Sequence, residues 1–211
     1  MTGKFITIEG IEGAGKTTCI SEIVSIIEKA EIPFIQTREP GGTKLGEEVR
    51  EILLDKRKNG MSTDAELLLM FSSRAEHLEK KILPAIESGK WVVCDRFIDA
   101  SYAYQGAGRG IKKERIKQLF DWLEGSLDPD LTILLDLPVD QGMSRIKSRQ
   151  ALDRFESENK IFFNKIREGY LDLALSHPDR IQLIDSSREL KSVQEDINKI
   201  MTRFIHENSG K

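Results

Sequence analysis

The chain has 211 residues, of which 39% are hydrophobic and 32% are charged, and its formal net charge is −3. This length and composition predict a globular protein of one domain or one domain with insertions, and the charge argues against nucleic acid as a partner. No apolar run approaches the roughly 20 residues of a membrane span. Because no signal peptide is recognisable, we expect a cytoplasmic protein.

Five short apolar runs are predicted to be β-strands, and helical patterns separate them. In chain order the runs cover residues 5–9, 34–37, 91–95, 131–136 and 181–184. Strands that alternate with helices predict a parallel sheet covered by helices on both faces. Runs that are apolar throughout fit strands buried on both faces. We therefore expect a three-layer α/β/α fold around a central five-stranded parallel sheet. Cys19 and Cys94 lie in apolar segments and are expected to be reduced, buried thiols.

A phosphate-loop pattern follows the first predicted strand. The segment Gly10-Ile11-Glu12-Gly13-Ala14-Gly15-Lys16-Thr17 matches G-x-x-x-x-G-K-[ST], and apolar residues at helical spacing follow it. A strand, a glycine loop and a helix together point backbone N–H groups at an anion. Lys16 is expected to reach the β- and γ-phosphates, and the Thr17 hydroxyl to hold Mg²⁺. The sequence therefore predicts a site for a nucleoside triphosphate.

One long helix is predicted over residues 63–87. Residues 67–71 are all apolar, so this part of the helix must be covered on more than one side by core, ligand or another subunit. Pro84 is expected to kink or interrupt the helix near its end.

Charged residues follow the second and third predicted strands, at the sheet edge where parallel α/β proteins bind ligands. Arg38 precedes a glycine turn and is well placed for a phosphate, although a solvated turn is the alternative. Asp95 ends the third strand in the position of a metal-steadying acid, with Arg96 beside it. Asp136 competes with Asp95 for this role, and a structural ion pair is the alternative reading of Asp95 and Arg96.

Two later segments carry further candidates. Residues 100–110 combine aromatic, amide and glycine residues that suit a pocket for a planar ligand, although glycine-rich loops are common. Residues 144–158 are rich in arginine, which in isolation is typical of a solvated helix face. Because Glu12 places a negative charge inside the phosphate loop, cationic groups for the phosphates must come from elsewhere. The 144–158 segment is the richest source, and guanidinium groups match phosphate oxygens.

The combination of these segments resembles the thymidylate kinases, which are nucleoside monophosphate kinases of the phosphate-loop class. The segments that carry the resemblance are 9–18, Arg38-Glu39-Pro40-Gly41-Gly42-Thr43, Asp95-Arg96-Phe97, Ala103-Tyr104-Gln105-Gly106 and Leu152-Asp153-Arg154. They occur in the order and spacing of the family and span nearly the whole chain. The phosphate loop alone is generic, whereas the full set is specific.

The resemblance implies transfer of the γ-phosphate of ATP to dTMP, giving ADP and dTDP, with Mg²⁺ present. The residues it places around ATP are Gly10, Ile11, Glu12, Gly13, Ala14, Gly15, Lys16, Thr17, Thr18 and Arg149. The residues it places around dTMP are Arg38, Phe71, Arg74, Arg96, Ser101, Tyr104 and Gln105. The groups it implies for catalysis are Lys16, Arg96, Arg154, Glu12 and Asp95, with Thr17 and Asp95 at the metal.

Individual roles on the dTMP side also follow from the resemblance. Phe71 is expected to stack on the thymine ring and Arg74 to bond a thymine carbonyl, and helical residues three apart share a face. Arg38 and Arg96 are expected to clamp the monophosphate. Tyr104 is expected to crowd the sugar 2′ position and so favour deoxyribose.

The resemblance further implies one phosphate-loop domain over residues 1–211, with a lid insertion at about 144–158. Glu12 together with the basic lid fits the bacterial type of thymidylate kinase. A homodimer that packs through helices, including the long one, would cover its apolar surface. The turn at residues 185–188 is a candidate wall of the adenine pocket.

Three alternatives stay open from the sequence. The first is a kinase for another nucleotide or a nucleoside, with dUMP as a side substrate. The second is an ATP- or GTP-driven switch, although no guanine-reading Asn-Lys-x-Asp segment is present. The third is a purely structural α/β protein, for which every cluster above would be a coincidence.

Overall fold

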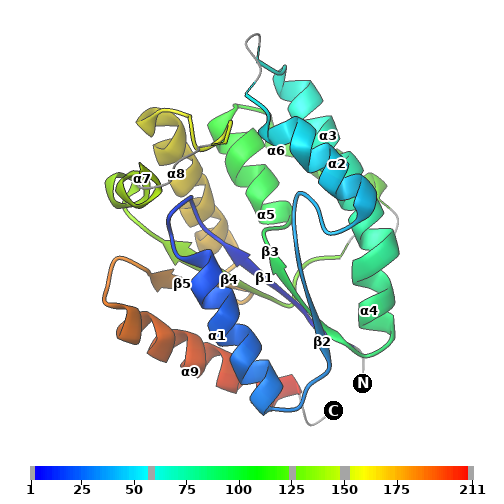
Figure 1. Ribbon diagram of the computed structural model, residues 1–211, viewed down its shortest axis with the longest axis vertical. Helices are drawn as coiled ribbons and strands as arrows, with labels where there is room; N and C mark the ends of the chain where they lie inside the picture. The colour runs from blue at the N-terminus through cyan, green and yellow to red at the C-terminus, as the bar shows by residue number, and fades with distance from the viewer. Residues whose placement is uncertain (1–2, 57–59, 124–126, 148–152, 209–211) are drawn as a thin grey trace.

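A five-stranded parallel sheet forms the centre of the computed structural model, which describes residues 3–56, 60–123, 127–147 and 153–208 (Figure 1). The strand order is β2-β3-β1-β4-β5. The strands are β1 (Phe5–Glu9), β2 (Phe34–Arg38), β3 (Trp91–Asp95), β4 (Leu131–Asp136) and β5 (Ile181–Asp185). All four pairings are parallel. The predicted fold class is confirmed, and only β2 and β5 extend one residue further than predicted.

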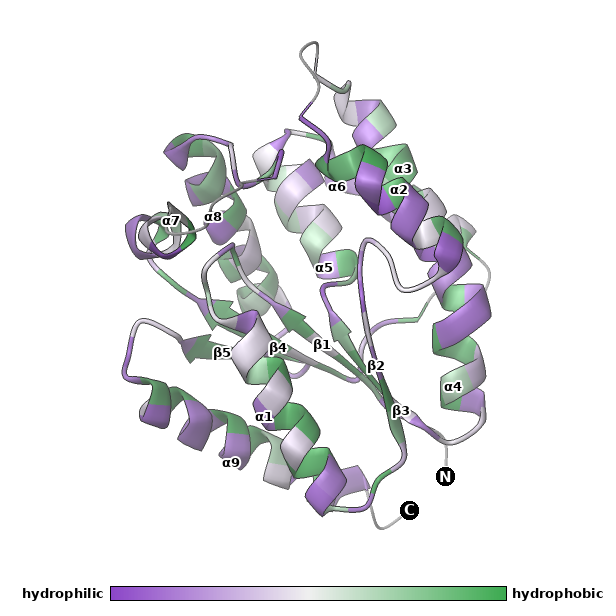
Figure 2. Ribbon diagram, in the orientation of Figure 1, coloured by the Kyte–Doolittle hydropathy of each residue, from purple (hydrophilic) through white to green (hydrophobic). Residues whose placement is uncertain are grey.

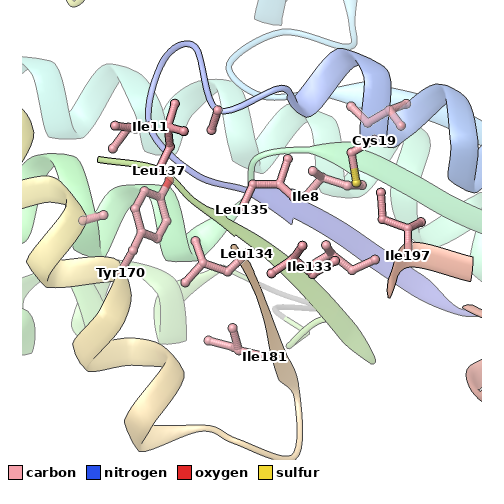
Figure 3. Packing of buried hydrophobic residues seen from close by; sticks show 14 of the residues in the cluster. Ile8, Ile11, Cys19, Ile133, Leu134, Leu135, Leu137, Tyr170, Ile181 and Ile197 are labelled. Atoms are coloured by element: carbon pink, nitrogen blue, oxygen red, sulfur yellow. The ribbon is translucent and has the colours of Figure 1, made fainter. Parts of the chain in front are cut away.

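Helices cover both faces of the sheet. On one face α1 (Lys16–Lys29) packs against α9 (Leu190–Asn208), and on the other face lies α8 (Lys160–Ser176). Figure 2 shows green, apolar strands between helices whose outer sides are purple and polar. Figure 3 shows Ile8, Cys19 and Ile197 on one side of the sheet and Leu134 and Tyr170 on the other. Apolar residues on both faces of each central strand explain why its sequence is apolar throughout.

The remaining helices belong to the segments of the chain that connect the strands. They are α2 (Lys44–Leu54), α3 (Thr63–His77), the π-helical turn η1 (Leu78–Ile82), α4 (Leu83–Glu87), α5 (Ile98–Ser101), the π-helical segment η2 (Tyr102–Gly108), α6 (Lys113–Trp122) and α7 (Val139–Lys147). The segment predicted as one helix over 63–87 is therefore α3, η1 and α4 in succession. Pro84 lies in the first turn of α4, where its missing N–H is tolerated. The expected interruption near Pro84 is thus a change from the π-helical turn η1 to the α-helix α4.

The glycine-containing segment at 100–110, considered as a loop from its sequence, is helical over most of its length. Its π-helical turns pack closely against α8, where a Cβ on Gly108 would lie 2.7 Å from the Phe162 ring. The glycine therefore allows close helix packing.

The carboxyl ends of the parallel strands bring the predicted segments to one edge of the sheet. The phosphate loop follows β1, Arg38 ends β2, Asp95 ends β3 and Asp136 ends β4. Residues 148–152 of the predicted lid, which include Arg149, lie outside the described residues. Both cysteines are free and buried, as predicted. Among the helices of the described ranges, none is long and apolar enough to cross a membrane.

Candidate active site

The phosphate loop connects β1 to α1 in the conformation that its glycines permit. Gly10 has a φ of 137°, and a Cβ there would lie 2.5 Å from the carbonyl oxygen of Leu135. Gly15 precedes α1 with a φ of 97°, in the region that favours glycine. The Lys16 ammonium folds back over the loop and donates to the carbonyl oxygens of Gly10 and Ile11, at 3.1 and 3.2 Å. The loop therefore surrounds its own cation and opens at the N-terminus of α1.

The pKa of the Lys16 ammonium lies below that of an ordinary lysine. Burial, followed by the positive charge of Arg96, lowers its pKa to about 8. An arriving triphosphate would supply the missing negative charge and favour the protonated form. The site thus holds a buried cation, and the negative charge of a bound ligand would offset the cost of burying it.

Glu12 links the phosphate loop to the opposite wall of the crevice. Its carboxylate accepts a 3.0 Å bond from Arg96 and bonds of 2.7 and 2.6 Å from the Tyr104 hydroxyl. The Arg96 guanidinium also lies 4.8 Å from the centre of the Tyr104 ring. The negative charge that looked unfavourable inside the loop is therefore balanced by Arg96. This contact joins a segment after β1 to segments after β3.

The backbone at Arg96 is turned so that its side chain enters this contact. Arg96 has a φ of 70°, which is uncommon for a residue with a side chain. The N–H of Arg96 donates to Ile8 at 3.0 Å, and the N–H of Phe97 donates to the Glu9 carboxylate at 2.7 Å. Unfavourable backbone geometry that is held in this way occurs often at functional sites.

A buried chain of hydrogen bonds supports Arg96 from behind. Arg96 donates to the Tyr170 hydroxyl at 3.0 Å, and Tyr170 donates to Glu9 at 2.6 Å. Burial, and then the negative charge of Asp99, raises the pKa of Glu9 to about 8. Glu9 and Tyr170 were not among the predicted site residues, because their sequence positions mark them only as core.

Asp95, rather than Asp136, has an oxygen available for a cation. The Oδ1 atom of Asp95 is buried and has no hydrogen-bond partner in the described part of the chain. Asp95 and Thr17 line the same cavity. Asp136 is instead engaged by Arg167, through bonds of 2.6 and 2.8 Å. The donor set fits Mg²⁺, which takes one or two protein ligands and completes its coordination with phosphates and water.

A second cavity, called here the acceptor cavity, lies beyond the Glu12–Arg96 contact and has a volume of about 90 Å³. Six of the predicted residues line it: Glu12, Arg74, Arg96, Ser101, Tyr104 and Gln105. Glu39, Arg50 and Met70 also line it, although the sequence analysis assigned them no role. The structure thus brings most of the predicted dTMP residues together with the acid of the phosphate loop.

Arg74 is held rigidly in the wall of the acceptor cavity. Its guanidinium donates to Glu39 at 2.8 Å, to the Ser101 hydroxyl at 3.0 Å and to the Phe97 carbonyl at 3.0 Å. Its side chain is only 2% exposed. These bonds use three of the five N–H donors of the guanidinium, so two donors remain.

The structure places Phe71 away from the acceptor cavity. Phe71 is 4% exposed and belongs to an apolar cluster with Phe5 and Phe97. Met70, four residues before Arg74, lines the cavity instead. Both residues share a helical face with Arg74 at spacings of three and four. The rotation of α3 decides between them, and the sequence does not reveal it.

Arg38 and Arg50 occupy different cavities. Arg38 is half exposed, pairs with Glu47 at 2.7 Å and lines the cavity of Thr17 and Asp95. Arg50 lines the acceptor cavity and donates to the Pro40 carbonyl at 2.9 Å. The side chain found beside Arg96 in the acceptor cavity is therefore Arg50. Its position on α2, after the glycine turn, gave no signal in the sequence.

Arg154 lies away from the phosphate loop in this conformation. It donates to Glu66 at 2.6 Å and to the Leu53 carbonyl at 2.7 Å. The Arg154 guanidinium also lies 4.3 Å from the centre of the Phe155 ring. The predicted contact with ATP phosphates is not made here by Arg154, and Arg149 falls outside the described residues. In the described part of the 144–158 segment, Arg145 reaches the loop and donates to the Gly13 carbonyl at 3.0 Å.

A third cavity adjoins the start of α1. Gly15 and Thr18 line it together with Ser186 and Arg188, which belong to the turn predicted as an adenine wall. Ser186 is fixed by bonds from its N–H and hydroxyl to the Asp136 carbonyl, both at 2.8 Å. The position of the turn agrees with that expectation.

Comparisons with known proteins agree with this geometry. The family model described as thymidylate kinase matches residues 8–197. The chain is 49% identical to the thymidylate kinase of Alkalilimnicola ehrlichii, covering 96% of each protein. It is 52% identical to that of Vesicomyosocius okutanii, covering 94% of this chain and 97% of the relative. A crystal structure of thymidylate kinase from Ehrlichia chaffeensis has a TM-score of 0.76 and 33% identity, covering 95% of this chain and 99% of that one. The chain therefore belongs to the thymidylate kinase family.

Proposed function

We propose that this chain transfers the γ-phosphate of ATP to dTMP and releases ADP and dTDP. The observation that carries the proposal is the Glu12–Arg96 contact, through which the phosphate loop and the acceptor cavity share one wall. Two nucleotides that bind on either side of this contact would meet with their phosphates. Family membership supplies the identity of the two nucleotides.

The chemistry requires alignment and charge neutralisation rather than a general base. The attacking oxygen belongs to a phosphate that carries about −1.5 to −2 charges at neutral pH. Lys16, Arg96 and Arg50 would oppose the repulsion between the two polyanions and hold them in line. Mg²⁺, held by Asp95 and Thr17, would supply further positive charge to the phosphates of ATP. When Arg96 binds the acceptor phosphate, it would give up part of its contact with Glu12.

The thymine ring would lie between Met70 and the polar groups of α3, α5 and η2. Arg74, Ser101 and Gln105 present those groups on one side of the acceptor cavity. Met70 supplies an apolar and adaptable surface, which takes the place proposed from the sequence for Phe71. We keep Tyr104 at the sugar, because its ring packs edge-to-face on Phe155 and its hydroxyl is fixed by Glu12.

Several sequence-based expectations stay proposals. The chain is proposed to be one domain, with an insertion at about 144–158 that supplies Arg149 and Arg154 to ATP. Arg38 was expected from the sequence to clamp the dTMP phosphate; because it lines the cavity of Thr17 and Asp95, we propose instead that it binds phosphate from the metal side of the crevice. The cytoplasmic location stays a prediction from the sequence.

A homodimer is proposed through α3 and α6. Leu68 is 56% exposed and Trp122 is 79% exposed, and both border a shallow cavity between these helices. Large apolar side chains that gather on one face of a protein often mark an interface. Sedimentation velocity should give a dimer for the wild type and a monomer for Leu68→Glu. A monomeric wild type would contradict the proposal.

The activity is tested with a panel of nucleoside monophosphates in the presence of ATP and Mg²⁺. ADP release, measured by a coupled assay, should depend on the acceptor and be fastest with dTMP, with dUMP as the nearest competitor. ADP release that needs no acceptor would favour the switch alternative. A preference for a purine monophosphate would contradict the assignment.

A further inference from the structure

Glu66 is a buried carboxylate directly behind the acceptor cavity. It lies in the first turn of α3 and is only 1% exposed. One of its oxygens, Oε1, accepts a 2.9 Å bond from the side-chain nitrogen of Gln105. The other, Oε2, accepts a 2.6 Å bond from Arg154, and the Arg109 Nε atom lies 3.3 Å from both oxygens. The phosphoryl transfer proposed above gives no role to Glu66 itself.

Ion pairs surround Glu66, and its carboxylate accepts in each of them. Arg109 also pairs with Glu158 at 2.6 Å, so two guanidiniums face two carboxylates in this cluster. A carboxylate flanked by arginines has no proton to donate. Any amide that hydrogen-bonds to it must do so through its nitrogen.

This requirement determines the orientation of the Gln105 amide. Gln105 is 1% exposed and lines the acceptor cavity. Its nitrogen is turned to Glu66, and no donor in the described ranges reaches its carbonyl oxygen Oε1. The opposite orientation would place Oε1 against a carboxylate oxygen and leave two acceptors facing each other. The Gln105 carbonyl is therefore the group that remains to accept a bond from a ligand.

The acceptor cavity then offers a defined pattern to a pyrimidine. Arg74 can only donate, and its guanidinium is fixed beside Ser101. Gln105 offers an acceptor. Thymine and uracil carry a carbonyl at ring position 4 and an N–H at position 3, which match a donor followed by an acceptor. Cytosine carries an amino group and an unprotonated nitrogen at these positions, so both contacts would be lost.

We propose that Glu66 is a positioning residue for base selection, because it fixes the Gln105 carbonyl toward the cavity and so favours a pyrimidine with an N–H at position 3 over cytosine. This inference rests on the proposed function, since it assumes that the acceptor base occupies this cavity. It adds a determinant of specificity that itself does not touch the base.

Glu66→Gln provides a sharp test, because it changes one atom and reverses the pattern. Arg109 would retain the single remaining oxygen of residue 66, also when Arg154 is at ATP, and this leaves the new amino group of residue 66 for Gln105. Gln105 would then turn its carbonyl to residue 66 and its nitrogen to the cavity. The cavity would present a donor where an N–H of thymine needs an acceptor.

The experiment compares kcat/KM for dTMP and dCMP at saturating ATP in the full chain. The ratio should fall by about 10- to 100-fold in Glu66→Gln. Arg109→Gln is the matched control, because it removes an ion pair of Glu66 but keeps the bond to Gln105, and its ratio should stay at the wild-type value. Absence of dTMP phosphorylation by the wild type would refute the proposed function itself, which separates the two failures.

A ratio unchanged in Glu66→Gln, at any level of activity, would overturn the inference, because a merely structural role would affect both substrates alike. If Glu66→Gln does not fold, Gln105→Leu replaces it. This variant keeps the ion pairs of Glu66 and removes the carbonyl, so the same fall in the ratio is expected. Wild-type discrimination in Gln105→Leu would overturn the inference equally.

Discussion

The phosphate loop and the acceptor cavity differ in how their residues come together. The loop is eight consecutive residues whose glycines fix its path, so sequence and site coincide. The acceptor cavity is assembled from the phosphate loop, the segments that follow β2 and β3, the helical elements α2, α3, α5 and η2, and the segment after residue 152. Its walls depend on how helices are rotated and packed. The comparison teaches that a local motif reveals a ligand class, whereas selectivity is decided by contacts between distant segments.

The largest effect is expected on the loop side. Lys16→Met should lower kcat/KM for ATP by about 10³-fold or more, since charge stabilisation of this kind in phosphoryl transfer is worth about 10³–10⁵. Lys160→Met is the control, because Lys160 is exposed and pairs with Asp140 at the surface. Steady-state kinetics with dTMP would measure both. A loss of less than tenfold in Lys16→Met would mean that the loop does not hold the transferred phosphate.

The acceptor side should respond to one arginine more than to the other. Arg50→Ala is expected to raise the KM for dTMP by about 10- to 100-fold, because it removes a charge-assisted bond to the acceptor phosphate. Arg38→Ala should change this KM by only about threefold, because Arg38 lines the metal side and is half exposed. The reverse ranking would show that the sequence-based assignment of Arg38 was correct and that the side chains rearrange on binding.

The neighbours Met70 and Phe71 provide a matched pair on α3. Met70→Ala should raise the KM for dTMP by about tenfold, through loss of apolar contact with the base, and cost little stability. Phe71→Ala should lower the free energy of unfolding by about 3–5 kcal/mol, because it opens a cavity in a core cluster. Urea titration and kinetics on both variants would measure the split. Equal losses of stability would contradict the rotation of α3 described above.

The smallest expected effect concerns stability rather than turnover. The pKa of Glu9 is raised from 4.5 to about 8, so the folded state holds a proton that the unfolded state has lost in this window. The free energy of unfolding contributed by Glu9 is therefore full below pH 4.5 and falls as the pH rises toward 8. Glu9→Gln keeps the shape of the side chain but removes the titrating group. Its free energy of unfolding should therefore fall less as the pH rises, by a few kcal/mol at most. Parallel pH dependences in the two proteins would argue against a protonated Glu9.

The sequence predicted the sheet and the loop because both depend on local patterns. Five apolar runs and a glycine motif carry that information within a few residues each. It also predicted Arg74, Arg96, Ser101, Tyr104 and Gln105 as one cavity, through the resemblance to a family. The resemblance assigned the base contact to Phe71, whereas Met70 lines the cavity, because helical spacing does not fix which of two neighbours faces a ligand. Glu9, Arg50 and Glu66 were missed because their partners lie on other elements.

A crystal structure with dTMP and a non-hydrolysable ATP analogue tests the central claim most directly. We expect the dTMP phosphate beside Arg96 and Arg50, with its oxygen in line with the γ-phosphate next to Lys16. The thymine ring should lie against Met70. A dTMP bound away from the Glu12–Arg96 wall, or separated from the γ-phosphate by protein, would contradict it.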